Sequence, residues 1–355
     1  FQAKGIVKGD RIAIMSRKWS EAHDAARPQD FKNREEKFTA LQANGTGPFM
    51  LVSRQADVQT VFRRNPRWWG RFDGNLQEVV FTPIKSDPTR TTALLSGSVD
   101  FVHDPAPQDV PRLRQGATKV LEGPENRILF IGMDQGRDEL LYSNVKGRNP
   151  FKDLRVRRAL YQSIDIDSLH THLMRGQSRP TGNIMHSPLG TYNDPEFERR
   201  LPFDPERARA LLAEAGYPQG FEVQLDCPNN RYIHDEEICV ALSAMWARVG
   251  VRVKVNAMPR ALFFPKTEKL DTSLYLFGWG GAITDAETTL TPVLRSRGEG
   301  GAGFYNIGNY RNPRLDELAI ASSRESDAAR REQLIKAAFR EHAEQIHHIP
   351  LHRQV

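Results

Sequence analysis

The hydrophobic pattern is clearest in the second half of the chain, where apolar positions switch between the spacings of strands and helices. Alternating apolar positions end at Cys227, and apolar residues at helical spacing then continue to Val249. Alternation resumes at Val251, Val253 and Val255. A strand, a helix and a strand in this order predict a right-handed crossover that joins two parallel strands.

The run LYLFGWGG at residues 274–281 is the most informative stretch. Its first four residues are apolar, which predicts a strand covered on both faces. Glycines around Trp279 then predict a break where the backbone turns or lets another group approach closely. Asp285 and Glu287 follow at once. Ligands of open α/β sheets bind outside the carboxyl ends of the strands, so we predict a recognition surface here.

Further helices are predicted from capping residues and apolar spacing. Asp153 is expected to cap a helix that reaches Ile164, and Asp204 with Pro205 starts another that Gly216 ends. A long helix is expected over 327–347, before the short apolar segment 349–351.

The first 130 residues are predicted to be rich in strands, with short helices. A turn and a strand are expected in 44–54, a helix capped by Asp87 over 87–95, and a short strand over Val99–Val102. Scattered Gly, Pro and Asn residues over 123–150 predict a crossing between domains.

Composition and charge are typical of a globular protein with room for two domains. The chain has 355 residues, 39% of them hydrophobic, and its 50 basic and 44 acidic residues are interspersed and leave a net charge of +6. The cluster Arg155, Arg157 and Arg158 is predicted to be the solvated face of a helix. No zinc, helix-turn-helix or RNA-binding signature accompanies the charge, so no nucleic-acid partner is expected.

Candidate chemistry is sparse. Cys227 and Cys239 are the only cysteines, which excludes a four-cysteine metal site and leaves either one local disulfide or two buried thiols. His170 and His172 would face apart on a helix, and the histidines near the end of the chain lack an acidic or cysteine partner at ligand spacing. The nucleophile-elbow, zinc-protease and phosphate-loop motifs are absent from the sequence. We therefore expect no catalytic residue, no metal and no cofactor, and no enzyme activity.

Eight stretches in a fixed order point to one family. The chain resembles the family 5 extracellular solute-binding proteins, the oligopeptide- and dipeptide-binding receptors of bacterial ABC importers. The matching stretches are NGTGPFMLVSR (44–54), RRNPRWWG (63–70), RTTALLSGSVDFV (90–102), NPFKDLRVRRALYQSID (149–165), FDPERARALLAEAGYPQGFEV (203–223), LFGWGG (276–281), YNIGNYRNPRLDEL (305–318) and IPLHRQ (349–354).

The resemblance implies an α/β fold of the two-lobed, type II-like periplasmic binding protein class, with mixed sheets flanked by helices that close on a ligand like a hinge. Residues 1–130 then correspond to the remainder of the first lobe, 131–148 to the hinge crossing, 149–345 to the second lobe and 346–355 to a strand returning across the hinge. Family members are normally longer at both ends, so the first lobe is expected to be incomplete.

The resemblance also implies a function. The chain is expected to be the substrate-binding subunit of an ABC transporter that captures a peptide or a peptide-like small polar solute between two lobes. Its partner would be the membrane permease of the importer, and the chain would act as a monomer in the periplasm or lipid-anchored on the outer face of the cytoplasmic membrane. The alternatives are a receptor of the same fold for an opine, a sugar or a metal chelate, or a hydrolase.

Six residues are the expected ligand contacts. Trp279 is either a stacking platform or a packed core indole, and the backbone at Gly280 and Gly281 can approach a ligand closely. Asp285 is either the polar anchor for a cationic group or the cap of the next helix. Tyr305 and Asn306 lie in a glycine-rich loop over 298–308, where loop residues often bind ligands but glycines also mark variable surface.

One departure from the family pattern yields a prediction. Peptide-binding members of the family usually carry an aspartate three residues after the tryptophan of the GW motif, where it pairs with the α-amino group of the ligand, and this chain has Ala282 there. We predict that Ala282→Asp strengthens binding of peptides with a free amino terminus, measured against the unmodified chain with the same peptide. Unchanged affinity would contradict the correspondence between the two positions.

Overall fold

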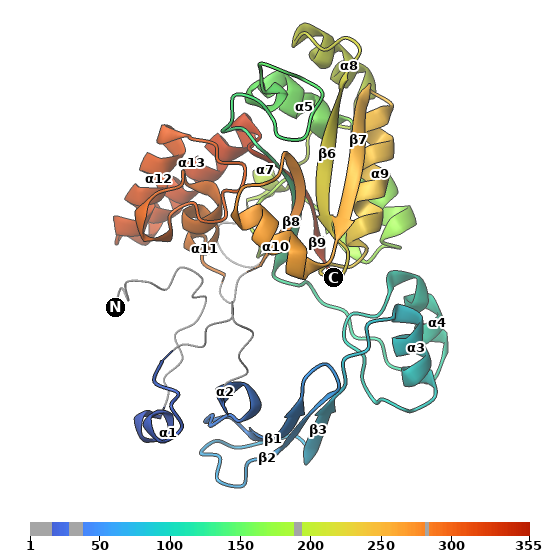
Figure 1. The fold of residues 1–355 in the computed structure, drawn as a ribbon, viewed down its shortest axis with the longest axis vertical. Helices are drawn as coiled ribbons and strands as arrows, with labels where there is room; N and C mark the ends of the chain where they lie inside the picture. The colour runs from blue at the N-terminus through green and yellow to red at the C-terminus, as the bar shows by residue number, and fades with distance from the viewer. Residues whose placement is uncertain (1–15, 28–37, 188–193, 281–283) are drawn as a thin grey trace. The chain divides into compact units, whose positions relative to one another are not determined.

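The computed structural model describes residues 16–27, 38–187, 194–280 and 284–355 (Figure 1). Contacts divide the chain between Pro105 and Ala106 into a smaller unit and a larger unit. The end of the first lobe expected at residue 130 and the crossing expected over 131–148 stay predictions. Arg127–Met133 form a buried strand of the larger unit.

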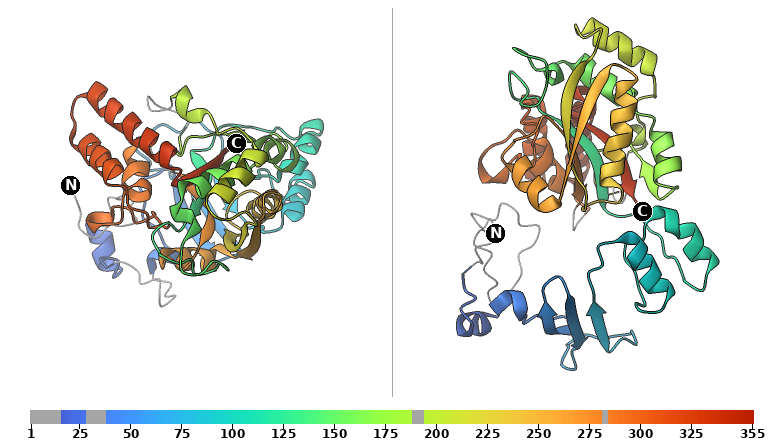
Figure 2. Two further views of the ribbon diagram at one scale, coloured as in Figure 1. Left: turned by 90° about the horizontal axis from the view of Figure 1, so that it is seen from above. Right: turned by 45° about the vertical axis from the view of Figure 1, so that its right-hand side comes forward.

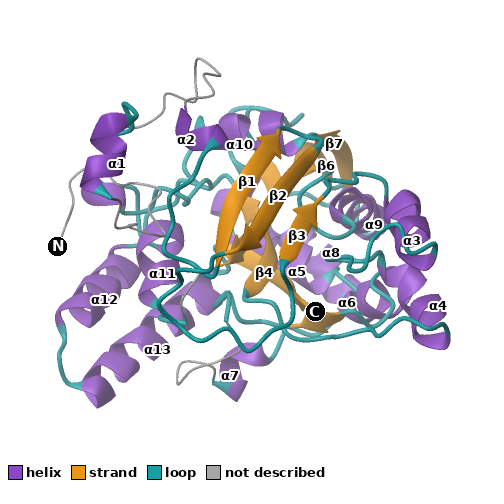
Figure 3. Cartoon of the chain, turned by 90° about the horizontal axis from the view of Figure 1, so that it is seen from below, coloured by secondary structure: helices purple, strands orange, loops and turns teal. Residues whose placement is uncertain are grey.

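The described part of the smaller unit contains one antiparallel sheet and short helices. Its three strands lie side by side in the order β1-β2-β3, and Phe62 of β2 lies opposite Leu51 on one side and Val79 on the other (Figure 3). The strand predicted in 44–54 is confirmed as β1. The elements are α1 (Arg17–Ala22), α2 (Phe38–Leu41), β1 (Phe49–Gln55), β2 (Gln59–Arg64), β3 (Glu78–Phe81) and α3 (Asp87–Leu95).

Two expectations for this unit were wrong in detail. Helix α3 is capped by the hydroxyl of Ser86, which accepts from the amide of Thr89, and Asp87 is the first helical residue. The strand expected over Val99–Val102 does not form, because the amide of Val99 donates to the carbonyl of Ala93 at the end of α3 and no strand lies beside it.

A mixed sheet organises the larger unit. Six strands of the described chain pair in the order β5-β9-β4-β8-β6-β7. Strands β6, β7 and β8 are parallel, and β4 runs antiparallel to both β8 and β9. Four strands therefore end at one edge of the sheet, where β4 begins, and we call this the carboxyl edge. The strands are β4 (Arg127–Met133), β5 (Ser178–Pro180), β6 (Phe221–Pro228), β7 (Val251–Met258), β8 (Leu274–Gly280) and β9 (His348–Gln354).

Helices cover both faces of this sheet (Figures 1 and 2). The predicted strand–helix–strand unit is confirmed as β6, α9 and the parallel neighbour β7. The helices are α4 (Val110–Gln115), α5 (Leu154–Gln162), α6 (Ile166–Ser168), α7 (Pro195–Glu198), α8 (Pro205–Glu214), α9 (Asp235–Ala247), α10 (Arg260–Glu268), α11 (Glu287–Thr289), α12 (Pro313–Arg324) and α13 (Ala328–Gln345). Single turns of 3₁₀ or π helix lie at 107–109, 150–152, 169–173, 290–294 and 299–301.

The alternating side chains of the central strands divide the interior into two cores. Leu129 and Ile131 of β4 point into a core with α5, α8 and α9, whereas Ile128 and Phe130 point into a core with α10, α12 and α13. Strand β8 is fully buried except at its last residue, as predicted for a strand covered on both faces.

A buried arginine joins the end of α13 to α5. The guanidinium of Arg157 is 5% exposed and donates to the carbonyls of Gln345, Phe151 and Lys152. Burial lowers the pKa of Arg157 to about 10. The prediction that this arginine lies on a solvated helix face was wrong, because its side chain satisfies the unpaired carbonyl at the end of α13 instead.

Neutral histidines fill the junction of α13 and β9. His342 Nε2 lies 2.9 Å from His348 Nδ1, and His347 Nδ1 lies 2.9 Å from Gln135 Oε1 while its ring stacks on Tyr310. Burial lowers the pKa of His342 to about 3, and it also lowers the pKa values of His347 and His348.

We predict that this cluster makes the larger unit sensitive to mild acid. A buried histidine with a lowered pKa does not change the free energy of unfolding while the pH is above about 6.5, the pKa in the unfolded chain. Below that pH the histidine of the unfolded chain binds a proton and that of the folded chain does not, so the unfolded state is favoured. Each such histidine should therefore lower the free energy of unfolding by about 2 kcal/mol between pH 6.5 and 5.

Chemical denaturation at a series of pH values measures this effect. His352 is also buried with a pKa lowered to about 3, so His352→Leu should flatten the loss of stability with acid. His172 is exposed, and His172→Asn should leave the slope unchanged. Equal slopes for the unmodified chain and His352→Leu would contradict the prediction.

Candidate functional site

The sheet forks at the carboxyl edge between β6 and β8. These strands pair only at Leu225 with Leu274 and at Asp226 with Tyr275. Beyond that point Tyr232, from the loop after β6, fills the fork: its hydroxyl accepts from the amide of Gly278 at 2.8 Å and donates to the carbonyl of Gly278 at 3.2 Å. A Cβ at position 278 would lie 2.5 Å from the Tyr232 ring, so this glycine is required by close approach.

The loop that carries Tyr232 is fixed from both ends. A disulfide joins Cys227 in β6 to Cys239 in α9, so the disulfide alternative is the one the structure contains. Within the loop, the carboxylate of Asp235 accepts from the amides of Arg231 and Tyr232 and from its own helix at Glu236. The side chains of this loop are therefore held at a defined place beside the end of β8.

Two arginines lie beside Tyr232, and the charge of a third, Arg260, acts on one of them. The guanidinium of Arg231 lies 5.1 Å from the centre of the Tyr232 ring, and that of Arg127 lies 5.9 Å from it. Arg127 is paired with Glu125, whereas the guanidinium of Arg231 has no hydrogen bond or ion pair within the described ranges. Burial, the charge of Arg127 and the charge of Arg260 lower the pKa of Arg231. The carboxyl edge thus presents a guanidinium that forms no ion pair with a carboxylate of the described residues, and Glu125 acts on its charge only from a longer distance.

Trp279 lies at the other side of the fork, mostly inside the second core. Its side chain is 9% exposed, its indole N–H donates to the carbonyl of Thr288 at 2.9 Å, and its ring meets Tyr305 at 4.8 Å between centres. The indole thus packs against the Tyr305 ring, and only a small part of this aromatic pair is exposed near the carboxyl edge.

Asp285 is engaged within the protein. Its Oδ1 atom accepts from Arg331 Nη2 at 2.9 Å and from the amide of Glu287 at 2.8 Å. Burial raises the pKa of Asp285, but the Arg331 guanidinium and the Glu287 amide outweigh this effect and hold it below its usual value. Its geometry matches the helix-cap alternative, and the ion pair leaves little of its charge for a ligand.

The remaining predicted contacts fall into three situations. Gly280 pairs with Arg127 across the sheet, and a Cβ there would lie 2.6 Å from the carbonyl oxygen of residue 126. Asn306 is fully buried, and its amide donates to the carbonyls of Arg295 and Tyr310, which ties the 295–310 loop together. Gly281 and position 282 lie outside the described residues.

The sequence prediction missed the arginine side of the site. A signal was present, because Arg231 follows the predicted strand ending at Cys227 and Arg260 follows the predicted strand ending at Val255. Parallel neighbours end at the same edge, so residues after both strands meet there. What the sequence did not show is that Arg231 forms no ion pair with any carboxylate in the described part of the chain.

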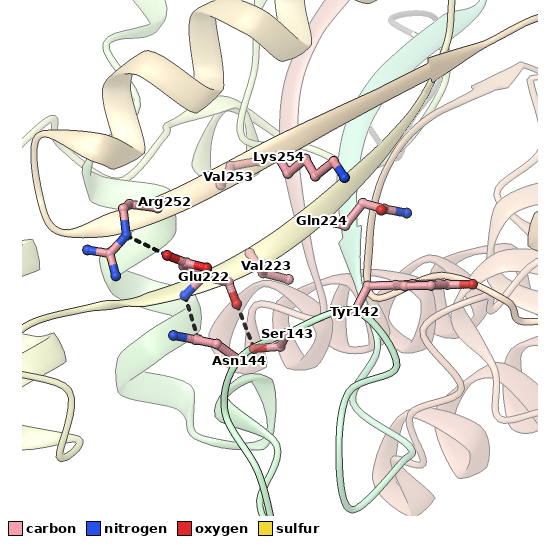
Figure 4. Close-up of a pocket in the computed structure, with 9 residues that line it drawn as sticks. All are labelled: Tyr142, Ser143, Asn144, Glu222, Val223, Gln224, Arg252, Val253 and Lys254. Carbon is pink, nitrogen blue, oxygen red and sulfur yellow. Dashed lines mark hydrogen bonds and ion pairs between the residues drawn. The ribbon is translucent and has the colours of Figure 1, made fainter.

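A separate hollow of about 430 Å³ lies over the amino-terminal halves of β6 and β7 (Figure 4). Its polar groups largely bind one another: Glu222 pairs with Arg252, the backbone amide of Glu222 donates to Asn144, and Ser143 donates to the carbonyl of Glu222. It lies away from the carboxyl edge, and its satisfied hydrogen bonds make it the weaker candidate for ligand recognition.

Tyr232→Phe tests the fork directly. Removing the hydroxyl leaves both the amide and the carbonyl of the buried Gly278 without a partner, so we predict a loss of about 2 kcal/mol in the free energy of unfolding. Tyr217→Phe is the matched control, because the Tyr217 hydroxyl makes no hydrogen bond to the described residues. Equal stability of the two variants in urea denaturation would show that the hydroxyl bridge is not required.

The described residues form neither a membrane-spanning helix nor a metal-binding cluster. None of its helices combines the length and the apolar character that crossing a membrane requires. No group of three or more His, Cys, Asp or Glu side chains in the described ranges is arranged to hold a metal ion.

Relatives with curated names share about a quarter of their residues with this chain. Heme-binding protein A of Haemophilus influenzae is 26% identical over 93% of this chain and 56% of that protein. A dipeptide-binding protein of Pseudomonas aeruginosa is 26% identical over 83% of this chain and 53% of that protein. The chain thus spans about half the length of these relatives.

Solved structures share the fold. The ABC transporter-associated periplasmic binding protein DppA from Helicobacter pylori, in complex with the peptide STSA, superposes with a TM-score of 0.79 at 22% identity, covering 96% of this chain and 62% of that one. The PBP AgaA from A. tumefacien R10, in complex with agropinic acid, gives a TM-score of 0.74 at 21% identity, covering 91% and 63%. These neighbours confirm the two-lobed periplasmic binding protein class expected from the sequence.

The family profile described as bacterial extracellular solute-binding proteins, family 5 Middle, matches residues 11–301, which is most of the chain. The resemblance noted in the sequence is therefore confirmed, and the chain belongs to the family 5 bacterial extracellular solute-binding proteins.

Proposed function

We propose that this chain is the solute-binding component of a bacterial ABC importer and that it captures a peptide or a peptide-like small polar solute. The family match over residues 11–301 carries this proposal. Relatives named for dipeptides, glutathione and heme support binding of small solutes as the common activity, with the solute differing between members.

The proposed contact surface is the carboxyl edge of the larger unit. Arg231 supplies a guanidinium that lies over the Tyr232 ring and has no hydrogen bond to a described residue, which suits a carboxylate because the two groups can form paired, charge-assisted hydrogen bonds. The rim of the Trp279–Tyr305 pair supplies apolar area for the body of the solute. Asp285 contributes little to a cationic ligand, because Arg331 already neutralises it.

This charge pattern favours a second candidate within the same class. A solute with a carboxylate and no free amine, such as an opine, uses Arg231 without needing an unpaired carboxylate in the protein. The likeness to a structure holding agropinic acid is compatible with this candidate, although at 21% identity it speaks for the fold alone.

No covalent step belongs to the proposal, since capture and release are binding equilibria. The partner would be the membrane permease of the importer, and the location would be the periplasm or a lipid anchor at the outer face of the cytoplasmic membrane. We also propose that the larger unit corresponds to the second lobe of the family fold, with the smaller unit part of the first and the chain acting as a monomer.

Native mass spectrometry of the purified chain, compared with the denatured sample, tests the function. We expect an additional mass that is present only in the native spectrum and that dissociates as a small molecule. If the native spectrum shows none, added di- and tripeptides should produce it. Absence of any bound mass across that series would count against solute binding by this chain.

Arg231→Gln tests the assignment of the site. We predict about tenfold weaker binding of a carboxylate-bearing peptide, because one charge-assisted contact is lost. Arg148→Gln is the matched control. Arg148 also lies over a tyrosine, Tyr217, at 4.3 Å, but this contact is next to the start of β6 and not at the carboxyl edge where β6 ends. If both variants lost the same affinity for the peptide, Arg231 would not be a specific ligand contact. The proposal that the chain binds a solute would still stand.

A further inference from the structure

A second cavity of about 250 Å³ lies in the larger unit, between α5, α7, the end of α13 and the start of β9. Buried residues form its floor and walls, among them Tyr161, Phe197 and Ile346. The rim is formed by exposed residues of α5, α7 and α13. The cavity therefore offers an apolar interior of a size that suits a molecule of roughly ten non-hydrogen atoms.

Two neutral histidines lie at the floor of this cavity. His342 and His348 both line it, and they share one hydrogen bond of 2.9 Å between Nε2 and Nδ1. The Nε2 atom of His348 is buried and has no hydrogen-bond partner within the described ranges. Buried polar atoms are nearly always paired, so this atom leaves one hydrogen-bonding position of the protein open beside the cavity.

The rim carries an excess of positive charge. Three arginines and two glutamates line it, which leaves one positive charge. Arg340 is paired with Glu196 by two contacts of 2.8 and 3.2 Å. Arg158 and Arg199 make no ion pair with any described residue, and both side chains are exposed at the opening. A carboxylate at the rim would therefore meet guanidinium groups that are not already neutralised.

We infer that this cavity is a second binding site, for a small carboxylic acid with an aromatic or branched apolar body. The apolar body fills the space between Tyr161 and Phe197, and the carboxylate lies at the rim near Arg158 and Arg199. The site is separate from the carboxyl edge: His348 begins β9 and Arg353 lies near its other end, about 17 Å away at the rise of a strand. The inference does not depend on the proposed function.

Phenylacetate and its uncharged counterpart phenylacetamide are suitable probes, followed by NMR titration of the full chain. We expect saturable binding of phenylacetate with a Kd of about 1 mM or tighter, and about tenfold weaker binding of phenylacetamide. Arg199→Gln should weaken phenylacetate binding toward that of the amide without changing the affinity for the amide.

Ala343→Trp blocks the opening, because Ala343 is an exposed rim residue of α13. It should weaken both probes at least tenfold. Ala329→Trp, at an exposed position of the same helix outside the cavity, is the matched control and should bind like the unmodified chain. A thermal unfolding curve establishes that each variant is folded, and the surface variant Arg199→Gln keeps the test independent of the bulky substitution.

Three results would overturn the inference. These are no saturable response of the unmodified chain to phenylacetate, equal affinity for the acid and the amide, and unchanged binding by a folded Ala343→Trp. Neither probe is a peptide, and Ala343 lies beside the start of β9, whereas Arg231 lies at the edge where β9 ends. These results therefore leave the proposed solute capture at the carboxyl edge unaffected.

Discussion

The direction of β4 is the constraint on which the larger unit depends. This strand lies between β8 and β9 and runs opposite to both, so all three share backbone hydrogen bonds over most of their length. Because β4 is reversed, the chain enters the sheet at the edge where β6, β7, β8 and β9 end. Arg127, the first residue of β4, therefore lies at the same edge as the residues that follow these four strands. One of them is Arg231, about a hundred positions later in the sequence. Successive side chains of β4 point to opposite faces of the sheet, and because a core covers each face, the strand has no polar side chain after its first residue.

The carboxylates at the carboxyl edge are used to fix the backbone of the loops that carry them. Asp235 fixes the loop after β6 by accepting its amides, and Asp285 caps the turn after β8 and pairs with Arg331. Both carboxylates are thus used to hold backbone in place. Arg231 stands on a rigid loop, between a disulfide and a tyrosine that bridges Gly278, and its guanidinium is left without such a role. A charged group that is positioned firmly and not used internally is the kind of group that recognises ligands.

The sequence predicted the parts of this fold whose signals are local. The helix α9 and strands β6 and β7 were found because apolar spacing and caps lie within each element, and the family resemblance supplied the fold class. Predictions failed where a partner distant in sequence decides the outcome. Arg157 is buried because Gln345 leaves an unpaired carbonyl 188 positions later. For Asp285 two roles were left open, and the ion pair with Arg331, 46 positions later, is a contact that its neighbours in sequence do not indicate. Val99–Val102 had a strand-like composition but no neighbouring strand to pair with. In the candidate site, Trp279 and Asp285 were noticed for their chemistry, whereas Arg231 was missed because only the structure shows which arginines form no ion pair with a described carboxylate.

The two ends of strand β9 show what burial requires of a side chain that can carry a charge. Near the carboxyl edge, Arg353 is 3% exposed and forms a two-contact ion pair with Glu198, and its guanidinium also donates to the carbonyl of Met185. That many partners are needed to offset the removal of a guanidinium from water. At the other end, His342 and His348 are equally buried but have few polar neighbours, so they stay neutral and share a single hydrogen bond. An imidazole can give up its proton where a guanidinium cannot, and this difference decides which residue type each end of the strand tolerates. Because both imidazoles are neutral, they place no charge beside the cavity, and the cavity therefore suits an apolar body whose charged group remains at the rim.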